Sequence, residues 1–97
     1  MGTLKPAFQK DGTVTAANAS KLNDGASALV LASDGAVKEL GGKPIARLVA
    51  QASHAQEPEW FTTAPIAAAR KALEKAGLSA SQIDLFEVNE AFAVVAM

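Results

Sequence analysis

The last fourteen residues constrain the fold more than any other stretch. Residues 83–88 alternate apolar and acidic side chains closely enough to predict a short β-strand. Asn89 follows where a strand would pass into a helix, and an asparagine there caps the free backbone N–H groups of the first turn, while Glu90 offsets the helix dipole. Residues 91–96 are apolar on every face, so we expect a helix buried on all sides. A chain that stops at Met97, inside such a helix, reads as cut.

Two further strands are expected upstream. Residues 26–32 are almost continuously apolar, which is typical of a strand covered on both faces of a sheet. Residues 45–52 contain further strand-forming side chains and begin a second sheet. Residues 13–16 favour an extended conformation after the Asp11-Gly12 turn.

Helices are predicted between these strands. A short helix over residues 35–40 ends at a pair of glycines, and an amphipathic helix over residues 64–76 ends before Gly77. A capping box over residues 79–82 predicts one further turn. The side chains expected to begin these helices are Ser33 or Asp34, Thr63 and Ser79. Strands and helices therefore alternate, which predicts an α/β fold with parallel strands and right-handed crossovers.

Composition limits what this chain does alone. About half of its 97 residues are apolar, but many are alanine, and four Phe and one Trp are its only aromatic side chains. A free-standing core would therefore be thin. The formal net charge of −1, without a basic block, argues against a nucleic-acid partner.

Membrane and thiol chemistry are also constrained. No apolar run approaches the roughly 20 residues of a membrane span, and the start of the chain lacks a signal-peptide pattern. We therefore expect a cytoplasmic protein without a membrane partner. The chain has no cysteine, which excludes a disulfide, a thiolate metal site and a cysteine nucleophile within these residues.

Two motifs identify a family resemblance. The run Asn89-Glu90-Ala91-Phe92-Ala93 resembles the Asn-Glu-Ala-Phe motif of the thiolases, the acetyl-CoA acyltransferases. Upstream, Phe8, residues 11–20 and residues 23–29 resemble the thiolase signature Gly-Thr-Val-Thr-Ala-x-Asn-Ala-Ser-x-x-Asn-Asp-Gly-Ala. The motifs occur in family order and at family-like separation, and the resemblance extends over residues 4–97.

The resemblance implies an architecture and an activity. Thiolases have two similar α/β halves in αβαβα layers, so residues 1–41 would end the N-terminal domain, and residues 42–97 would begin a truncated C-terminal domain. The parent would transfer acetyl or acyl groups between coenzyme A thioesters through a cysteine acyl-enzyme. No cofactor would be tightly bound, because the acyl-CoA is the substrate, and the full-length protein would be a homo-oligomer, a dimer or a tetramer. The nucleophilic cysteine and the active-site histidine lie outside this chain, so we expect the 97 residues alone to be inactive.

Asn89 is the candidate catalytic residue. From the residues alone it reads as a structural N-cap. The resemblance instead implies that it holds a water, which helps a histidine stabilise the enolate oxygen of an acyl thioester. A fixed neutral donor aimed at developing negative charge needs no reorganisation during the reaction.

The resemblance also implies a binding site for the acyl group and the pantetheine arm of coenzyme A. Ser20, otherwise read as a loop hydroxyl bonded to its own backbone, would contact pantetheine. Ala17 and Lys21 stand where the family often has glycine, and Phe61 begins a segment that commonly reads Met-Gly-Thr-Gly-Pro, which leaves the acyl chain length open. The other candidate walls are Phe8, Ala16, Leu22, Phe61, Ala91 and Phe92.

Other polar residues receive structural interpretations. His54 is a lone loop histidine without a nucleophile to activate, and the Gly-His-Pro segment of thiolases is missing from this chain. Capping and the helix dipole explain Glu90 adequately. One histidine and scattered carboxylates provide no metal-ligand spacing, so no metal site is expected.

Two other functions remain open at this point. One is a non-catalytic, thiolase-like protein that binds acyl chains or lipid and lacks the nucleophile even at full length. The other is a free-standing module whose apolar end is completed by further copies of itself. The flanking sequence separates the first from an enzyme, and a defined oligomer of this chain alone would support the second.

Overall fold

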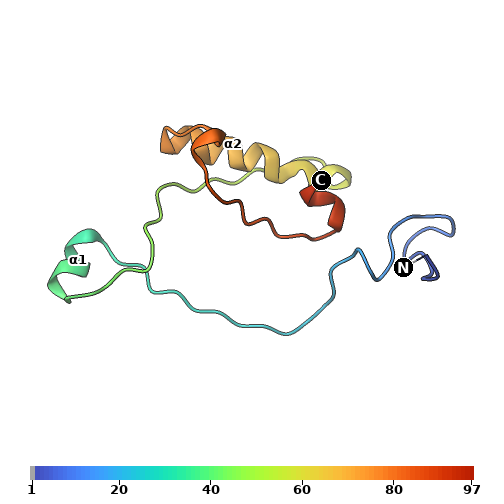
Figure 1. The fold of residues 1–97 in the computed structure, drawn as a ribbon, viewed down its shortest axis with the longest axis horizontal. Coiled ribbons are helices and arrows are strands. Elements are labelled where there is room, and N and C mark those ends of the chain that lie inside the picture. The colour runs from blue at the N-terminus through green and yellow to red at the C-terminus, as the bar shows by residue number, and fades with distance from the viewer. Residues whose placement is uncertain (1) are drawn as a thin grey trace.

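The computed structural model describes residues 2–97. Its elements are α1 (Asp34–Glu39), the 3₁₀ turn η1 (Pro58–Thr63), α2 (Ala64–Ala76) and the 3₁₀ turns η2 (Ala80–Gln82) and η3 (Ala93–Ala96). Figure 1 shows α2 above the C-terminal segment and α1 at the opposite end from the N-terminal loops, with long connections between them. The radius of gyration is 18.5 Å, whereas a compact domain of this length has one of about 13 Å. The chain is therefore open rather than closed around a core.

The three predicted strands are not formed in residues 2–97. Residues 26–32, 45–52 and 83–88 contain no strand, and Figure 1 shows the first of them as a drawn-out connection below α2. Leu29 is 87% exposed and Val30 is 96% exposed. The apolar pattern reports the surface a strand needs to bury, but a strand also needs a neighbour to complete its hydrogen bonds. Because no such neighbour is present, the α/β sheet expected from the pattern is not found within the described residues.

The helix signals with local causes are confirmed. In α1 the Ser33 Oγ accepts a hydrogen bond from the Ala36 N–H at 3.2 Å, and Gly41 follows with a φ of 62°. The capping box is also formed, because the Ser79 N–H donates to Gln82 Oε1 at 2.9 Å. Each of these contacts joins residues at most three apart, so the local sequence suffices to specify them.

The helix α2 has the predicted bounds. Gly77 takes a φ of 67° at its C-cap, a left-handed conformation that glycine adopts without steric cost. Thr63 occupies the N-cap position but does not cap the helix, because its Oγ1 donates to the Trp60 carbonyl at 2.9 Å. The helix is amphipathic in sequence, but Ile66 on its apolar face remains 55% exposed. The apolar face of α2 is therefore formed, but the described residues do not fully cover it.

The predicted final helix is wrong in extent and burial. Only η3 forms there, and it begins after Phe92 rather than after Asn89. Asn89 is therefore not the N-cap, and Glu90 does not occupy a first turn. Val94 is 61% exposed, so the apolar run is not buried on all sides. Its composition requires a surrounding layer that these residues do not supply.

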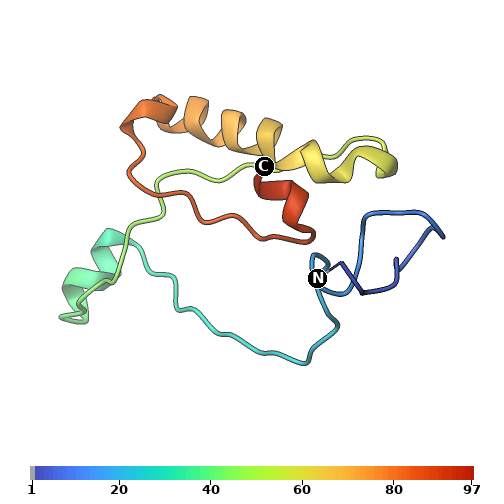
Figure 2. The ribbon, with the colours of Figure 1, turned by 45° about the vertical axis from the view of Figure 1, so that its right-hand side comes forward.

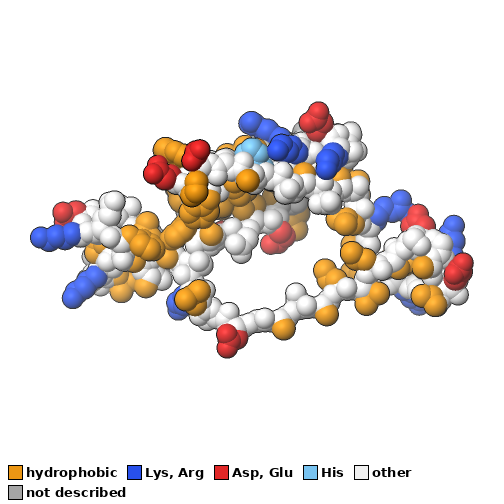
Figure 3. Space-filling model, turned by 180° about the vertical axis from the view of Figure 1, so that it is seen from behind, with side chains coloured by type: hydrophobic (Ala, Val, Ile, Leu, Met, Phe, Trp, Pro, Cys, Tyr) orange, Lys and Arg blue, Asp and Glu red, His pale blue; other side chains and the backbone are white. Residues whose placement is uncertain are grey.

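No residue between 2 and 97 is fully buried. The accessible surface is 9097 Å², whereas a folded protein of 9.9 kDa exposes about 5,200 Å² and its unfolded chain about 14,400 Å². The space-filling view shows hydrophobic side chains uncovered along the thin connection at the lower edge and beneath the helical layer (Figure 3). The elements are therefore held by local hydrogen bonds and a few long-range contacts.

This absence of a core predicts how the isolated chain unfolds. Cooperative unfolding depends on a shared buried interior, so we expect a gradual loss of helical circular dichroism on heating, without a sigmoidal transition. Urea titration followed by the same signal should likewise be broad, with a small slope, because unfolding exposes less new surface than it does in a compact domain of this length. A sharp transition with the same midpoint by circular dichroism and by Trp60 fluorescence would contradict this prediction.

Candidate functional site

The two family-like motifs meet in space. The Ser20 N–H donates to the Ala91 carbonyl at 3.0 Å, and the Ala93 N–H donates to the Asn18 carbonyl at 3.0 Å. These bonds flank an antiparallel bridge between Ala19 and Phe92. Both ribbon views show the end of the N-terminal loops beside the red C-terminal segment (Figures 1 and 2). We call this contact the motif bridge.

The loop on the N-terminal side of the bridge is shaped by its own side chains. Asn18 Oδ1 accepts from the Thr15 N–H at 2.7 Å, and Asn18 Nδ2 donates to the Thr13 carbonyl at 3.1 Å. Thr15 Oγ1 accepts from the Ala17 N–H at 3.2 Å. The Asn18 side chain therefore bonds to the backbone of its own loop on both sides of its amide. Within residues 2–97, no hydrogen bond of the Ser20 hydroxyl is found, and its backbone makes the contact instead.

Phe92 lies between two other aromatic rings. Its ring centroid is 6.2 Å from that of Phe8 and 6.0 Å from that of Phe61, with interplanar angles of 68° and 60°. Both pairs have the edge-to-face geometry that aromatic rings prefer. This aromatic cluster joins the N-terminal loop, η1 and the C-terminal motif.

An apolar hollow of about 450 Å³ lies beside the cluster. Its walls come from η1, the first turns of α2 and the segment before η3, and they include Phe61, Pro65, Phe86, Val88, Asn89 and Ala91. The Asn89 carbonyl accepts from the Ala91 N–H at 3.0 Å, whereas its side-chain amide makes no hydrogen bond to the described residues. A free amide on an apolar wall is available to a ligand or a water.

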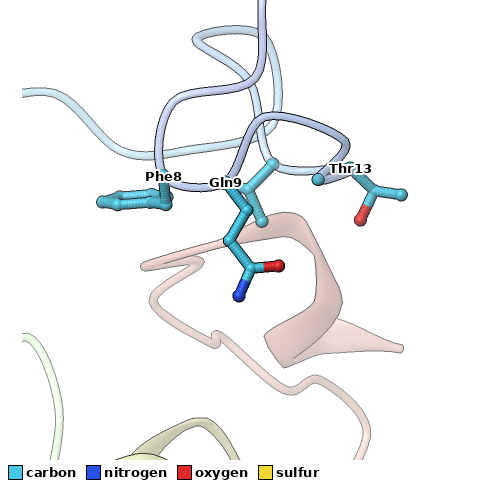
Figure 4. A pocket seen from close by; sticks show the side chains of 5 residues that line it. Phe8, Gln9 and Thr13 are labelled. Carbon is cyan, nitrogen blue, oxygen red and sulfur yellow. The ribbon is translucent and has the colours of Figure 1, made fainter.

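A smaller hollow of about 280 Å³ lies within the N-terminal loop. Figure 4 shows Phe8, Gln9 and Thr13 around it, with the C-terminal segment alongside. Phe8 thus contributes to this hollow and to the aromatic cluster.

The structure brings most of the sequence-predicted site residues together. Asn89, Phe61 and Ala91 line the larger hollow, while Phe8 and Phe92 belong to the cluster. Ser20 reaches the site through its backbone. Ala16 lies on an exposed turn of the loop, and Leu22 is fully exposed in the drawn-out connection. Neither lines a hollow in residues 2–97, so their binding roles stay predictions.

Sequence reasoning missed several walls of the larger hollow. Phe86 and Val88 reach it because alternate residues of an extended segment share one side. Pro65, Ala68 and Ala69 reach it from successive turns of α2, where residues three or four apart are neighbours. The sequence shows both the two-residue and the helical periodicity. It does not show that the two segments face the same hollow.

The remaining polar residues do not form a second site. His54 Nδ1 lies 3.1 Å from Lys71 Nζ, and this contact joins the loop to α2. In residues 2–97 no group of three potential metal ligands gathers. None of the helices in that range is long and apolar enough to cross a membrane.

Family comparison agrees with the motifs. Residues 42–97 match the model of the thiolase C-terminal domain, and residues 1–35 match that of the thiolase N-terminal domain. The first match alone covers more than half of the chain. The chain belongs to the thiolase family.

Individual relatives have the same character. The chain is 60% identical over 94 residues to a Dictyostelium discoideum protein named "Probable acetyl-CoA acetyltransferase", covering 97% of this chain and 23% of that protein. Crystal structures of the human mitochondrial 3-ketoacyl-CoA thiolase and of the Bacillus anthracis acetyl-CoA acetyltransferase each match with a TM-score of 0.92, at 47% and 48% identity. Each match covers 98% of this chain and 24% of the solved chain. The chain thus spans about a quarter of the length of these relatives, and its open conformation is that of a thiolase segment.

These matches suggest a hybrid thiolase for experiments, in which the 97 residues replace the aligned segment of the Dictyostelium protein. In this hybrid, Phe92→Leu removes both edge-to-face contacts of the aromatic cluster. Since such pairs contribute about 0.5–1.5 kcal/mol each, we expect a loss of about 1–3 kcal/mol in the free energy of unfolding by urea. The matched control is Phe86→Leu, which changes a hollow wall without an aromatic partner in the described residues. An equal loss in both variants would rule out a special role for the cluster.

Proposed function

We propose that this chain is part of a thiolase that transfers acetyl or acyl groups between coenzyme A thioesters. The observation that carries the proposal is the meeting of the two family motifs at the motif bridge, beside an apolar hollow with a free amide on its wall. The names of the relatives support acetyl-CoA as the substrate class. The reaction is formation or cleavage of a 3-ketoacyl-CoA.

Asn89 supplies the chemistry contributed by this chain. Its neutral amide holds a water that, with a histidine from the rest of the enzyme, stabilises the negative charge that develops on the thioester oxygen. Phe86 and Val88 stand beside Asn89 on the wall of the hollow, and a hydrogen bond to that oxygen strengthens when the rest of the enzyme excludes water from this wall. The cysteine that forms the acyl-enzyme also comes from the rest of the protein, since this chain contains none.

The aromatic cluster and Ser20 bind the substrate. Phe61 and Phe92 provide a wall against which an acyl group loses contact with water. The Ser20 N–H donates a hydrogen bond to the Ala91 carbonyl, so Ser20 lies close to the segment that carries Asn89. A pantetheine arm that contacts the Ser20 hydroxyl therefore extends toward Asn89. Phe8 closes the N-terminal side of this path. Ala16 and Leu22 join it once the rest of the fold positions their segment.

The wider assignments follow from the family and from the sequence. We place the domain boundary between residues 41 and 42, in the connection after α1. The full-length protein is a homo-oligomer, a dimer or a tetramer, without a tightly bound cofactor. We assign it to the cytoplasm, although the human relative is described as mitochondrial.

Substitution of Asn89 tests the catalytic assignment. In the hybrid thiolase, Asn89→Ala should lower kcat for acetoacetyl-CoA thiolysis by about 10²–10³-fold, the usual effect of removing one donor to a developing oxyanion. The control is Gln51→Ala, which removes an amide that lines neither hollow. A hybrid that binds acyl-CoA without turnover would show that these 97 residues do not support catalysis even when the rest of the protein comes from a relative. Full activity of the Asn89→Ala hybrid would remove Asn89 from the mechanism.

The isolated chain should have no thiolase turnover. It contains no nucleophilic cysteine, and its one histidine lies against Lys71. The measurement is the release of acetyl-CoA from acetoacetyl-CoA by the purified 97-residue chain, with the hybrid thiolase as the positive control. Activity that persists after removal of any contaminating host thiolase would refute this assignment of roles.

A further inference from the structure

We infer that Asn18 is a positioning residue for the thiolase site, acting through the motif bridge on Asn89 and on the substrate path. The inference rests on the proposed function, because it concerns the geometry of that site. Asn18 lies in the exposed loop and lines neither hollow. Its effect is therefore exerted through other residues rather than through contact with the substrate.

The Asn18 side-chain amide closes the loop with both its oxygen and its nitrogen. Oδ1 accepts from the Thr15 N–H at 2.7 Å, and Nδ2 donates to the Thr13 carbonyl at 3.1 Å. One side chain thus fixes a backbone donor and a backbone acceptor that lie two residues apart. Asparagine is suited to this task because it carries a donor and an acceptor on one short, planar group. Aspartate lacks the donor, and serine cannot span both partners.

The Asn18 backbone then transmits this geometry to the other motif. Its carbonyl accepts from the Ala93 N–H at 3.0 Å, and two residues later the Ser20 N–H donates to the Ala91 carbonyl at 3.0 Å. The two hydrogen bonds thus hold the backbone on either side of Phe92, at Ala91 and at Ala93. The direction of these backbone groups depends on the loop conformation that the Asn18 side chain imposes.

The segment held by these two bonds includes Phe92 and directly follows Asn89 and Glu90 in sequence. The Ala91 N–H donates to the Asn89 carbonyl at 3.0 Å, so Asn89 is tied by a tight turn to the residue that the bridge holds. Phe92, at the centre of the bridge, contacts Phe8 and Phe61. A shift of the loop therefore moves Asn89, the aromatic cluster and Ser20 together. Displacements near 1 Å in a catalytic geometry reduce rates by about 100-fold.

The test uses the hybrid thiolase with Asn18→Ala, which removes both loop-closing bonds. We expect kcat to fall by about 10- to 100-fold, because Asn89 is displaced, and KM for acetyl-CoA to rise severalfold, because Ser20 and the cluster move as well. The matched control is Gln51→Ala, which removes an amide side chain that lines neither hollow. It should retain both parameters within about twofold, in the range of a neutral surface change.

The KM value separates positioning from stability. A residue that only stabilises the fold lowers the amount of active enzyme and leaves KM unchanged, and an unchanged KM for Asn18→Ala would overturn the inference. If that variant does not fold, Asn18→Asp keeps the acceptor and loses the donor, and its KM should again rise. An Asp variant with an unchanged KM would also overturn it. An inactive unsubstituted hybrid would instead contradict the proposed function. That outcome is distinct from failure of the Asn18 inference, which requires an active unsubstituted hybrid.

Discussion

The motif bridge is the contact on which the rest of this structure depends. In an open chain with no buried residue between 2 and 97, two backbone hydrogen bonds join segments more than 70 residues apart in sequence. They bring Phe92 to Phe8 and set the Asn89 turn against the walls of the larger hollow. Closing so long a loop costs conformational entropy, which two exposed hydrogen bonds and two ring contacts offset only in part.

The sequence predicted the helices well because their causes are local. Ser33 and the Ser79–Gln82 box act over three residues, and Gly77 needs only its own positive φ. The strands failed for the complementary reason. Residues 26–32 carry the apolar pattern of an interior strand, but hydrogen-bonded pairing is a property of two segments, and no segment pairs with them in residues 2–97. The run after Phe92 failed likewise, since its burial depends on layers supplied from elsewhere.

The candidate site was predictable to the extent that motif residues lie beside one another. Asn89, Ala91 and Phe92 are near neighbours in sequence, and resemblance alone placed Phe61 and Phe8 with them, as the hollow and the ring contacts do. Nothing in the sequence indicated that Asn18 and Ser20 reach this group through main-chain atoms. Backbone hydrogen bonds leave no side-chain signature, and such links are found only in the folded geometry.

The uncovered strand-like segment has a consequence for the chain as a material. Residues 26–32 form a largely apolar run of seven residues without charge or proline, and no backbone hydrogen bond within residues 2–97 involves them. Such runs are templates for cross-β stacking between identical molecules. Asp24 and Asp34 stand on either side as charged gatekeepers, which slow that stacking by repulsion. High-salt buffers screen this repulsion, so dilute, low-salt solutions favour the dispersed chain over fibrils.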